Sequence, residues 1–184
     1  MRTIFDHRTV QIVFADLQDS IVAVSRTNSP ATIRRSAGVL GKVAQALDIP
    51  FTVSVAPRPS GPGVIAELPA ASPFVRGGPC CWDDRPWRDA TAAHDRKTLV
   101  ICGVTSEIVV LHTALDALAA GYDVVVPVDA SGGISERTEN AALHQIAGAG
   151  GTVTSVASLA TGMVRDFTTP TGRSVIAALH ELMA

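Results

Sequence analysis

The sequence predicts an α/β domain of three layers (α/β/α), with a mostly parallel central sheet of about six strands and helices on both of its faces. Two observations predict this fold class. Short apolar runs typical of buried strands alternate along the chain with longer segments whose apolar residues recur at helical spacing. The 184 residues contain no internal repeat and no linker long enough to divide domains, so we expect one domain over 1–184.

The elements are expected in the order strand 10–16, helix 30–48, strand 51–56, loop 57–73, strand 74–76, helix 85–94, strand 98–102, helix 105–120, strand 123–128, helix 134–149, strand 152–154, helix 159–167 and helix 174–183.

In the first half of the chain, the boundaries justify the elements. Ser29 is a typical N-cap for a helix whose first residue is Pro30, and the pair 49–50 ends that helix with a second proline. The apolar runs on either side of the helix predict buried strands. Residues 57–73 are rich in Pro and Gly, which predicts a loop with at most one helical turn, near 64–68.

In the second half, glycines and a serine mark the ends of the helices. Segment 105–120 is nearly all apolar, so we expect a helix that is buried or lies at an interface, with Gly121 as its C-cap. Ser135 is a suitable N-cap for the next helix, and Gly150 and Gly151 end it. The two segments after residue 154 are also expected to be helical.

The composition excludes several classes of protein. Apolar residues make up 47% and charged residues 17%, which indicates a globular chain, and a net charge of −2 gives no reason to expect nucleic acid or an anionic membrane as partner. No apolar run approaches the roughly 18 residues that a membrane helix needs, and the polar first eight residues predict no signal peptide. The sparse charge and the apolar segment 105–120 predict a buried subunit face and therefore self-association.

The cysteines and histidines suggest a reduced compartment and no metal site. The three cysteines, at positions 80, 81 and 102, cannot pair off, so we expect free thiols in a cytoplasmic protein. Cys102 lies inside a strand and is expected to be inert, and neither Cys80 nor Cys81 lies at a recognisable helix start. None of the five histidines has the spacing of a metal ligand, and no glycine-rich phosphate loop is present.

Several polar residues follow predicted strands, and the carboxyl ends of parallel strands meet at one edge of a sheet, where ligands bind. Asp16 ends the first strand, where a carboxylate can act as a general acid or base or can cap a nearby turn. Arg76 follows another strand and either stabilises Asp16 or an oxyanion, or is a solvated loop residue. Trp82 is either a wall of the substrate site or part of the core or an interface.

The segment 99–112 predicts a buried strand, a tight turn at Gly103 and a helix. A thiol in the first turn of such a helix would ionise readily and act as a nucleophile, because the helix N-terminus favours negative charge. This chain has Val109 at the position where that thiol is expected.

These features resemble the isochorismatase-like cysteine hydrolases, over residues 10–167. The matching motifs are Asp16-Leu-Gln18, a mid-chain basic residue at Arg76, Gly103-Val-Thr-Ser-Glu-Ile-Val-Val110, Gly121-Tyr122 and Asp129-Ala-Ser-Gly132. The resemblance is greatest to the YcaC-like branch, through Trp82-Asp83 and Arg165-Asp166.

This resemblance implies a cis peptide at Val104–Thr105 and catalytic positions at Asp16, Arg76 and Val109, with Val109 replacing the family cysteine. It further implies a small-molecule site at Gln18, Trp82, Val104, Thr105 and Ser106. It also implies a homo-oligomer, a dimer or a larger ring. The metal-binding histidine of the nicotinamidase branch is missing from 54–62, so neither a metal nor another cofactor is expected.

Three hypotheses follow for the activity. In the first, the chain has lost cysteine-hydrolase activity and serves as a small-molecule binder or an oligomeric scaffold. In the second, it hydrolyses substrates without a thiol, with Asp16 as a general acid, as isochorismatases of the family cleave a vinyl ether. In the third, Ser106, Cys80 or Cys81 supplies a substitute nucleophile.

Overall fold

The computed structural model describes residues 5–183, so the first residues of the polar N-terminal stretch lie outside the described part. All six strands are parallel, in the order β3-β2-β1-β4-β5-β6. The strands are β1 (Val10–Ala15), β2 (Phe51–Val55), β3 (Phe74–Val75), β4 (Thr98–Gly103), β5 (Asp123–Pro127) and β6 (Thr152–Thr154). The helices are α1 (Asp19–Val22), α2 (Pro30–Ala46), α3 (Arg85–Ala93), α4 (Leu111–Ala119), α5 (Glu136–Gly148), α6 (Val156–Met163) and α7 (Pro170–His180).

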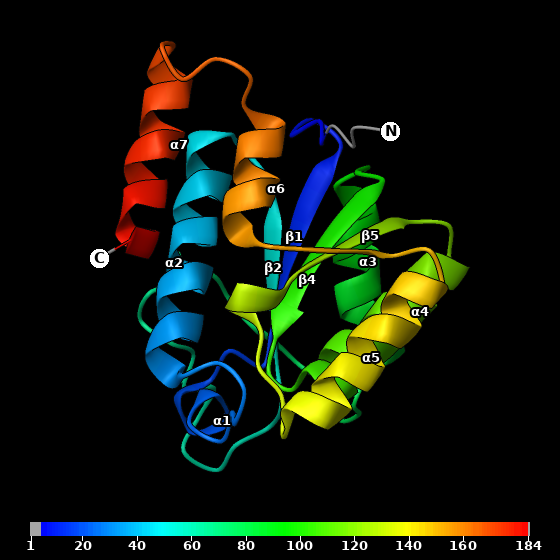
Figure 1. Ribbon diagram of the computed structural model, residues 1–184. Coiled ribbons are helices and arrows are strands. Elements are labelled where there is room, and N and C mark those ends of the chain that lie inside the picture. Colours follow the sequence, from blue (N-terminus) through cyan, green and yellow to red (C-terminus); the bar gives the residue numbers. More distant parts are fainter. Residues whose placement is uncertain (1–4, 184) are drawn as a thin grey trace.

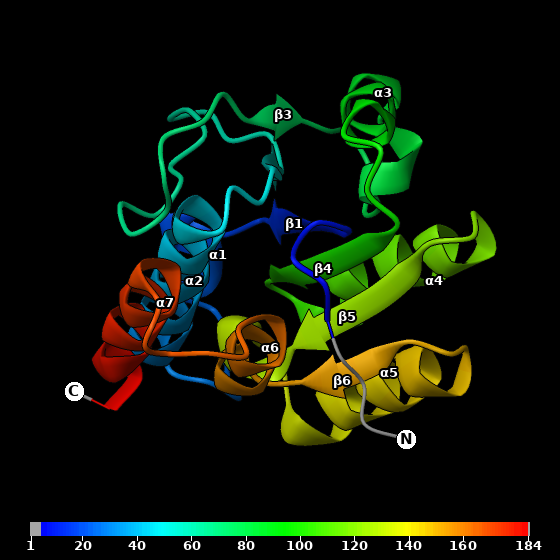
Figure 2. The same cartoon turned by 90° about the horizontal axis from the view of Figure 1, so that it is seen from above.

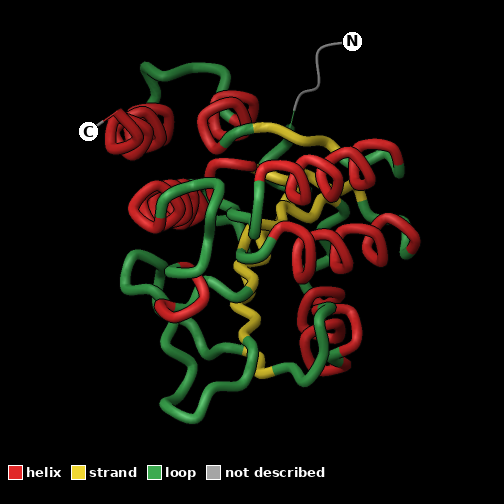
Figure 3. The backbone as a smooth tube through the Cα atoms, turned by 60° about the horizontal axis from the view of Figure 1, so that its bottom comes forward, coloured by secondary structure: helices red, strands yellow, loops and turns green. Residues whose placement is uncertain are grey.

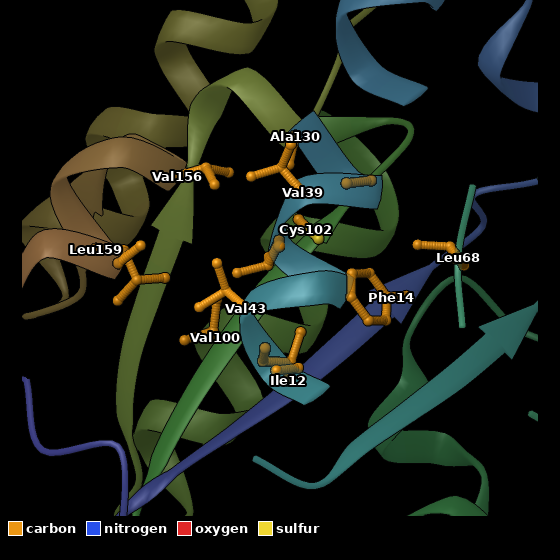
Figure 4. Packing of buried hydrophobic residues seen from close by; sticks show 14 of the residues in the cluster. Ile12, Phe14, Val39, Val43, Leu68, Val100, Cys102, Ala130, Val156 and Leu159 are labelled. Atoms are coloured by element: carbon orange, nitrogen blue, oxygen red, sulfur yellow. The ribbon is translucent and has the colours of Figure 1, made fainter. Parts of the chain in front are cut away.

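The helices cover both faces of the sheet, so the predicted three-layer class is confirmed (Figures 1 and 2). Alternate residues of β1 separate the two cores. Ile12 and Phe14 belong to a core that includes residues of α2, α6 and α7. Figure 4 shows the α2 residues Val39 and Val43 and the α6 residues Val156 and Leu159 on this face. Val13 and Ala15 pack on the other face with α3, α4 and α5. Because strand residues alternate between faces and every residue of β1 is buried, this central strand is apolar almost throughout.

The predicted helix caps at Ser29 and Ser135 are confirmed. The Ser29 hydroxyl accepts a hydrogen bond from the Thr32 amide, and the Ser135 hydroxyl accepts one from the Thr138 amide.

The predicted bounds of the last two helices were wrong, because other residues cap them. Ser155 is the N-cap of α6, which begins at Val156, and Thr169 is the N-cap of α7, which begins at Pro170. Each hydroxyl accepts a hydrogen bond from a backbone amide in the first turn of its helix.

Two further differences lie near the edge of the sheet that carries the site. The expected helix 105–120 begins as a wider π-helical turn, Ser106–Val110, before α4 starts. The short helix α1 after β1 was not expected, and the suggested turn near 64–68 is not helical. The connection from β2 to β3 is drawn as loop throughout in Figure 3. No helix among residues 5–183 is long and apolar enough to cross a membrane.

Candidate functional site

A cavity of about 300 Å³ opens at the carboxyl ends of β1, β3 and β4. Four of the residues that the sequence singled out line it: Asp16, Arg76, Val104 and Thr105. We call it the Asp16 cavity. A second cavity, of about 330 Å³, lies at the opposite edge of the sheet, where Thr98 and Asp123 begin their strands. The position rule for parallel sheets favours the Asp16 cavity as the ligand site.

Asp16 and Arg76 form a buried ion pair at the cavity. Nη1 of Arg76 donates to Oδ1 of Asp16 at 2.8 Å, and Nη2 donates to Oδ2. The side chains are only 3% and 9% exposed, for Arg76 and Asp16 respectively. Nη1 also donates to the Ser54 hydroxyl at 3.2 Å. Two parallel N–H···O bonds of this kind fix the orientation of both groups.

The backbone brings the two partners together from different strands. Asp16 follows β1 with a φ of 53°, a left-handed conformation that aspartate tolerates better than most residues, and its amide donates to the carbonyl of Ser54. Arg76 follows the edge strand β3. Burial alone would lower the pKa of its guanidinium, but the hydrogen bonds and charge of Asp16 outweigh this and raise that pKa above its usual range. Both oxygens of Asp16 therefore face a permanent cation.

Val109, where the sequence resemblance leads us to expect the nucleophile, is a buried hydrocarbon side chain. It lies in the π-helical turn, is 1% exposed, and belongs to the apolar cluster that includes Val13, Ala15 and Cys81. Val109 does not line the cavity, so no reactive group is supplied from this position.

The turn between β4 and the π-helical turn has the close approach that its glycine predicts. A Cβ on Gly103 would lie 1.9 Å from the carbonyl oxygen of Ala15. The amide of Gly103 donates to the Ser131 hydroxyl at 3.2 Å. The next peptide, Val104–Thr105, is cis, as the resemblance implies. The hydroxyl of Thr105, which borders the cavity, is buried and has no hydrogen-bond partner among the described residues.

The structure places three other predicted site residues away from the cavity lining. Gln18 is fully buried and bonds to loop backbone, as described below. Ser106 is fully buried, and its hydroxyl donates to Glu139 at 2.7 Å. Trp82 makes edge-to-face contacts with Trp87 and Tyr122, at centroid distances of 5.6 and 5.5 Å. The role of a substrate wall thus falls to other residues of the cavity.

The cysteines lie in environments that suppress thiol reactivity. Burial raises the pKa of Cys80 to about 11, and the nearby Asp116 carboxylate adds to the rise. Burial also raises the pKa of Cys81, although the positive charge of Arg76 opposes this rise. Burial raises the pKa of Cys102 as well. A thiol is nucleophilic only as the thiolate, so these three thiols are expected to be poor nucleophiles at neutral pH. Within residues 5–183, no three His, Cys, Asp or Glu side chains are grouped as metal ligands.

The cavity also has walls that sequence reasoning missed. Ile21 comes from α1 and Val24 from the turn that follows it. Ile108 comes from the π-helical turn, and Arg58 comes from the loop after β2. Arg58 could have been predicted as a site residue from the sequence, because it follows a strand, as Arg76 does. The position of α1 could not have been predicted, since this helix has only four residues and its N-cap residue, Gln18, makes no side-chain capping bond.

The chain is similar to a known protein family, to a curated protein and to solved structures. The Isochorismatase domain family matches residues 10–158. The probable hydrolase YcaC of Escherichia coli (strain K12) is 29% identical over 169 residues, which cover 88% of this chain and 81% of that protein. The structure of YcaC from Pseudomonas aeruginosa, with hexane-2,5-diol and covalent acrylamide, has a TM-score of 0.91 and 25% identity, over 100% of this chain and 93% of that chain. The structure of the Escherichia coli YcaC gene product, described as an octameric hydrolase of unknown specificity, has a TM-score of 0.85 and 27% identity, over 100% and 90%.

Proposed function

This chain belongs to the isochorismatase family and is of the YcaC type, and from that premise we propose that it binds a small molecule in the Asp16 cavity without cysteine-hydrolase chemistry. One observation supports the proposal: Val109, which we assign to the position of the family nucleophile, is buried among apolar side chains, while the Asp16–Arg76 pair borders an open cavity. In a family cysteine hydrolase, the aspartate takes the thiol proton and the thiolate attacks the substrate carbon. Valine has no proton to give and no lone pair to attack with.

Hydrolysis without a thiol is the second candidate, because Asp16 borders the cavity and can reach a bound molecule. As a general acid it would need to carry a proton. The bidentate pairing with Arg76 matches the ionised carboxylate, which favours the role of a hydrogen-bond acceptor or base. Residual hydrolysis would therefore use Asp16 to orient or deprotonate water.

Restoring the thiol tests the main proposal. We expect wild type to show no amide or ester hydrolysis that iodoacetamide abolishes. Val109→Cys, a change of similar volume, puts a thiol at the buried position that we assign to the nucleophile, and its rate of alkylation relative to wild type measures whether reagents reach that position from the cavity. The assay compares wild type, Val109→Cys and Asp16→Asn on amides, esters and isochorismate, with circular dichroism as the folding control.

Alkylation-sensitive hydrolysis by wild type would contradict the proposal. Turnover that survives alkylation but is lost in Asp16→Asn would establish the second candidate. If the protein binds no ligand and turns over no substrate, the hypothesis that stands is that of an oligomeric scaffold.

We also propose that the chain forms a homo-oligomer. The Escherichia coli relative is described as octameric, and this chain exposes Val75 and Ile134, each by more than half of its surface. The expected result of light scattering after size exclusion is a mass that is a multiple of 19.1 kDa. A single species of one chain at micromolar concentration would contradict it.

A further inference from the structure

Arg58 brings a positive charge to the Asp16 cavity that no carboxylate among residues 5–183 pairs with. Its exposed side chain borders the same cavity as Asp16 and Arg76. Among the described residues, no carboxylate lies within ion-pair distance of Arg58, whereas the charge of Arg76 is matched by Asp16. The cavity lining therefore has two guanidinium groups and one carboxylate, and its charge favours an anionic ligand.

The loop that carries Arg58 is held in place by Gln18. The Gln18 side-chain amide donates to the carbonyl of Ala56 at 3.0 Å and to that of Pro62 at 2.6 Å, and its oxygen accepts the amide of Ala56 at 2.9 Å. These bonds join the two ends of the segment that contains Arg58. The amide of Asp19 adds a bond to the carbonyl of Gly63 at 2.7 Å. The loop backbone is thus fixed before any ligand binds, which reduces the entropy cost of binding.

The other walls of the cavity are largely apolar. Ile21, Val24 and Ile108 face it, and Val24 and Ile108 are 52% and 44% exposed. Nε of Arg76 is also buried, and it makes no hydrogen bond within the described part of the chain. The site combines hydrogen-bond donors with an apolar surface.

We propose that the Asp16 cavity binds a small organic monoanion, an apolar body with one carboxylate, and that Arg58 binds the carboxylate. Gln18 is a positioning residue that acts through the loop of Arg58. This inference rests on the proposed function, since it names the ligand class of the same site. The apolar walls favour an organic carboxylate over inorganic phosphate, which has no apolar part to bury.

A matched pair of probes tests the charge preference. Benzoate and benzamide share a ring and differ in that one has a carboxylate and the other a neutral amide. Isothermal titration of wild type is expected to show benzoate binding about tenfold tighter than benzamide, since a charged group forms the stronger hydrogen bonds. Arg58→Gln should remove that preference and leave the benzamide affinity unchanged, and Arg58→Lys should restore part of it. Arg173→Gln, an exposed arginine on α7, is the control and should behave as wild type.

The role of Gln18 has its own readout. Gln18→Asn should reduce the benzoate preference while benzamide still binds, which a general loss of folding would not produce. Equal binding of both probes by wild type, or an intact preference in Arg58→Gln, would overturn the inference and leave the proposed binding site standing. Phosphate competing as well as benzoate would overturn the organic ligand class. Binding of neither probe would count against both the inference and the proposed function.

Discussion

Replacing Arg76 by methionine is expected to lower the free energy of unfolding by about 3 kcal/mol or more. The substitution keeps an unbranched apolar stem but leaves the Asp16 carboxylate, 9% exposed, without the cation that donates its two charged hydrogen bonds. A buried charge without a partner costs far more than the intact pair contributes, because the desolvation penalty is no longer offset. The measurement is urea unfolding followed by circular dichroism.

Two comparisons make this result specific to the buried pair. The double variant Asp16→Asn/Arg76→Met removes both charges and should recover a large part of the loss, so the two substitutions should be strongly non-additive. Arg85→Met removes the cation of the exposed pair with Asp89, whose side chains are 82% and 72% exposed, and should change stability by less than about 0.5 kcal/mol. Equal effects of Arg76→Met and Arg85→Met would show that the Asp16–Arg76 pair is not desolvated as described.

The second large effect is expected from Gly103→Ala. The added Cβ would lie 1.9 Å from the carbonyl oxygen of Ala15, which also accepts the amide of Val104 and is fixed within the sheet. Backbone on two adjacent strands must move apart, so we expect a loss of about 3 kcal/mol or failure to fold. Any folded fraction should have a displaced Val104–Thr105 segment and a weakened ligand site.

A second glycine provides the control for that substitution. Gly148 ends α5, and a Cβ there would meet nothing within 4 Å. Gly148→Ala should leave stability unchanged or raise it by a few tenths of a kcal/mol, because alanine loses less backbone entropy in a helix. Thermal unfolding of the two variants, side by side with wild type, measures the difference. A Gly103→Ala protein as stable as Gly148→Ala would contradict the close approach of β1 and β4.

The fold and the meeting of Asp16 with Arg76 could be predicted because both follow from strand position. Parallel strands present their carboxyl ends at one edge, so a residue after β1 and one after β3 are brought near each other by topology. The bidentate geometry could not be predicted, since it depends on the left-handed backbone at Asp16 and on the register of a two-residue edge strand.

The parts of the site that sequence reasoning missed depend on long-range contacts. The segment that carries Arg58 was expected only as a loop. Its position is set by Gln18, 38 residues from Ala56 and 44 from Pro62, and no local pattern encodes those bonds. The role of Trp82 could not be predicted from the sequence for a different reason. A tryptophan after a strand fits either a substrate wall or a core, and only the packing against Trp87 and Tyr122 distinguishes them.

The same aromatic cluster determines what ultraviolet spectroscopy can report. The chain has two tryptophans and one tyrosine, and all three lie together on the face of the sheet covered by α3, α4 and α5. Intrinsic fluorescence from tryptophan and tyrosine therefore observes this layer alone, while α2, α6 and α7 contain neither residue. A helix that detaches from the opposite face would change the far-ultraviolet signal and leave the emission nearly constant. Disagreement between the two probes would identify the layer that unfolds first.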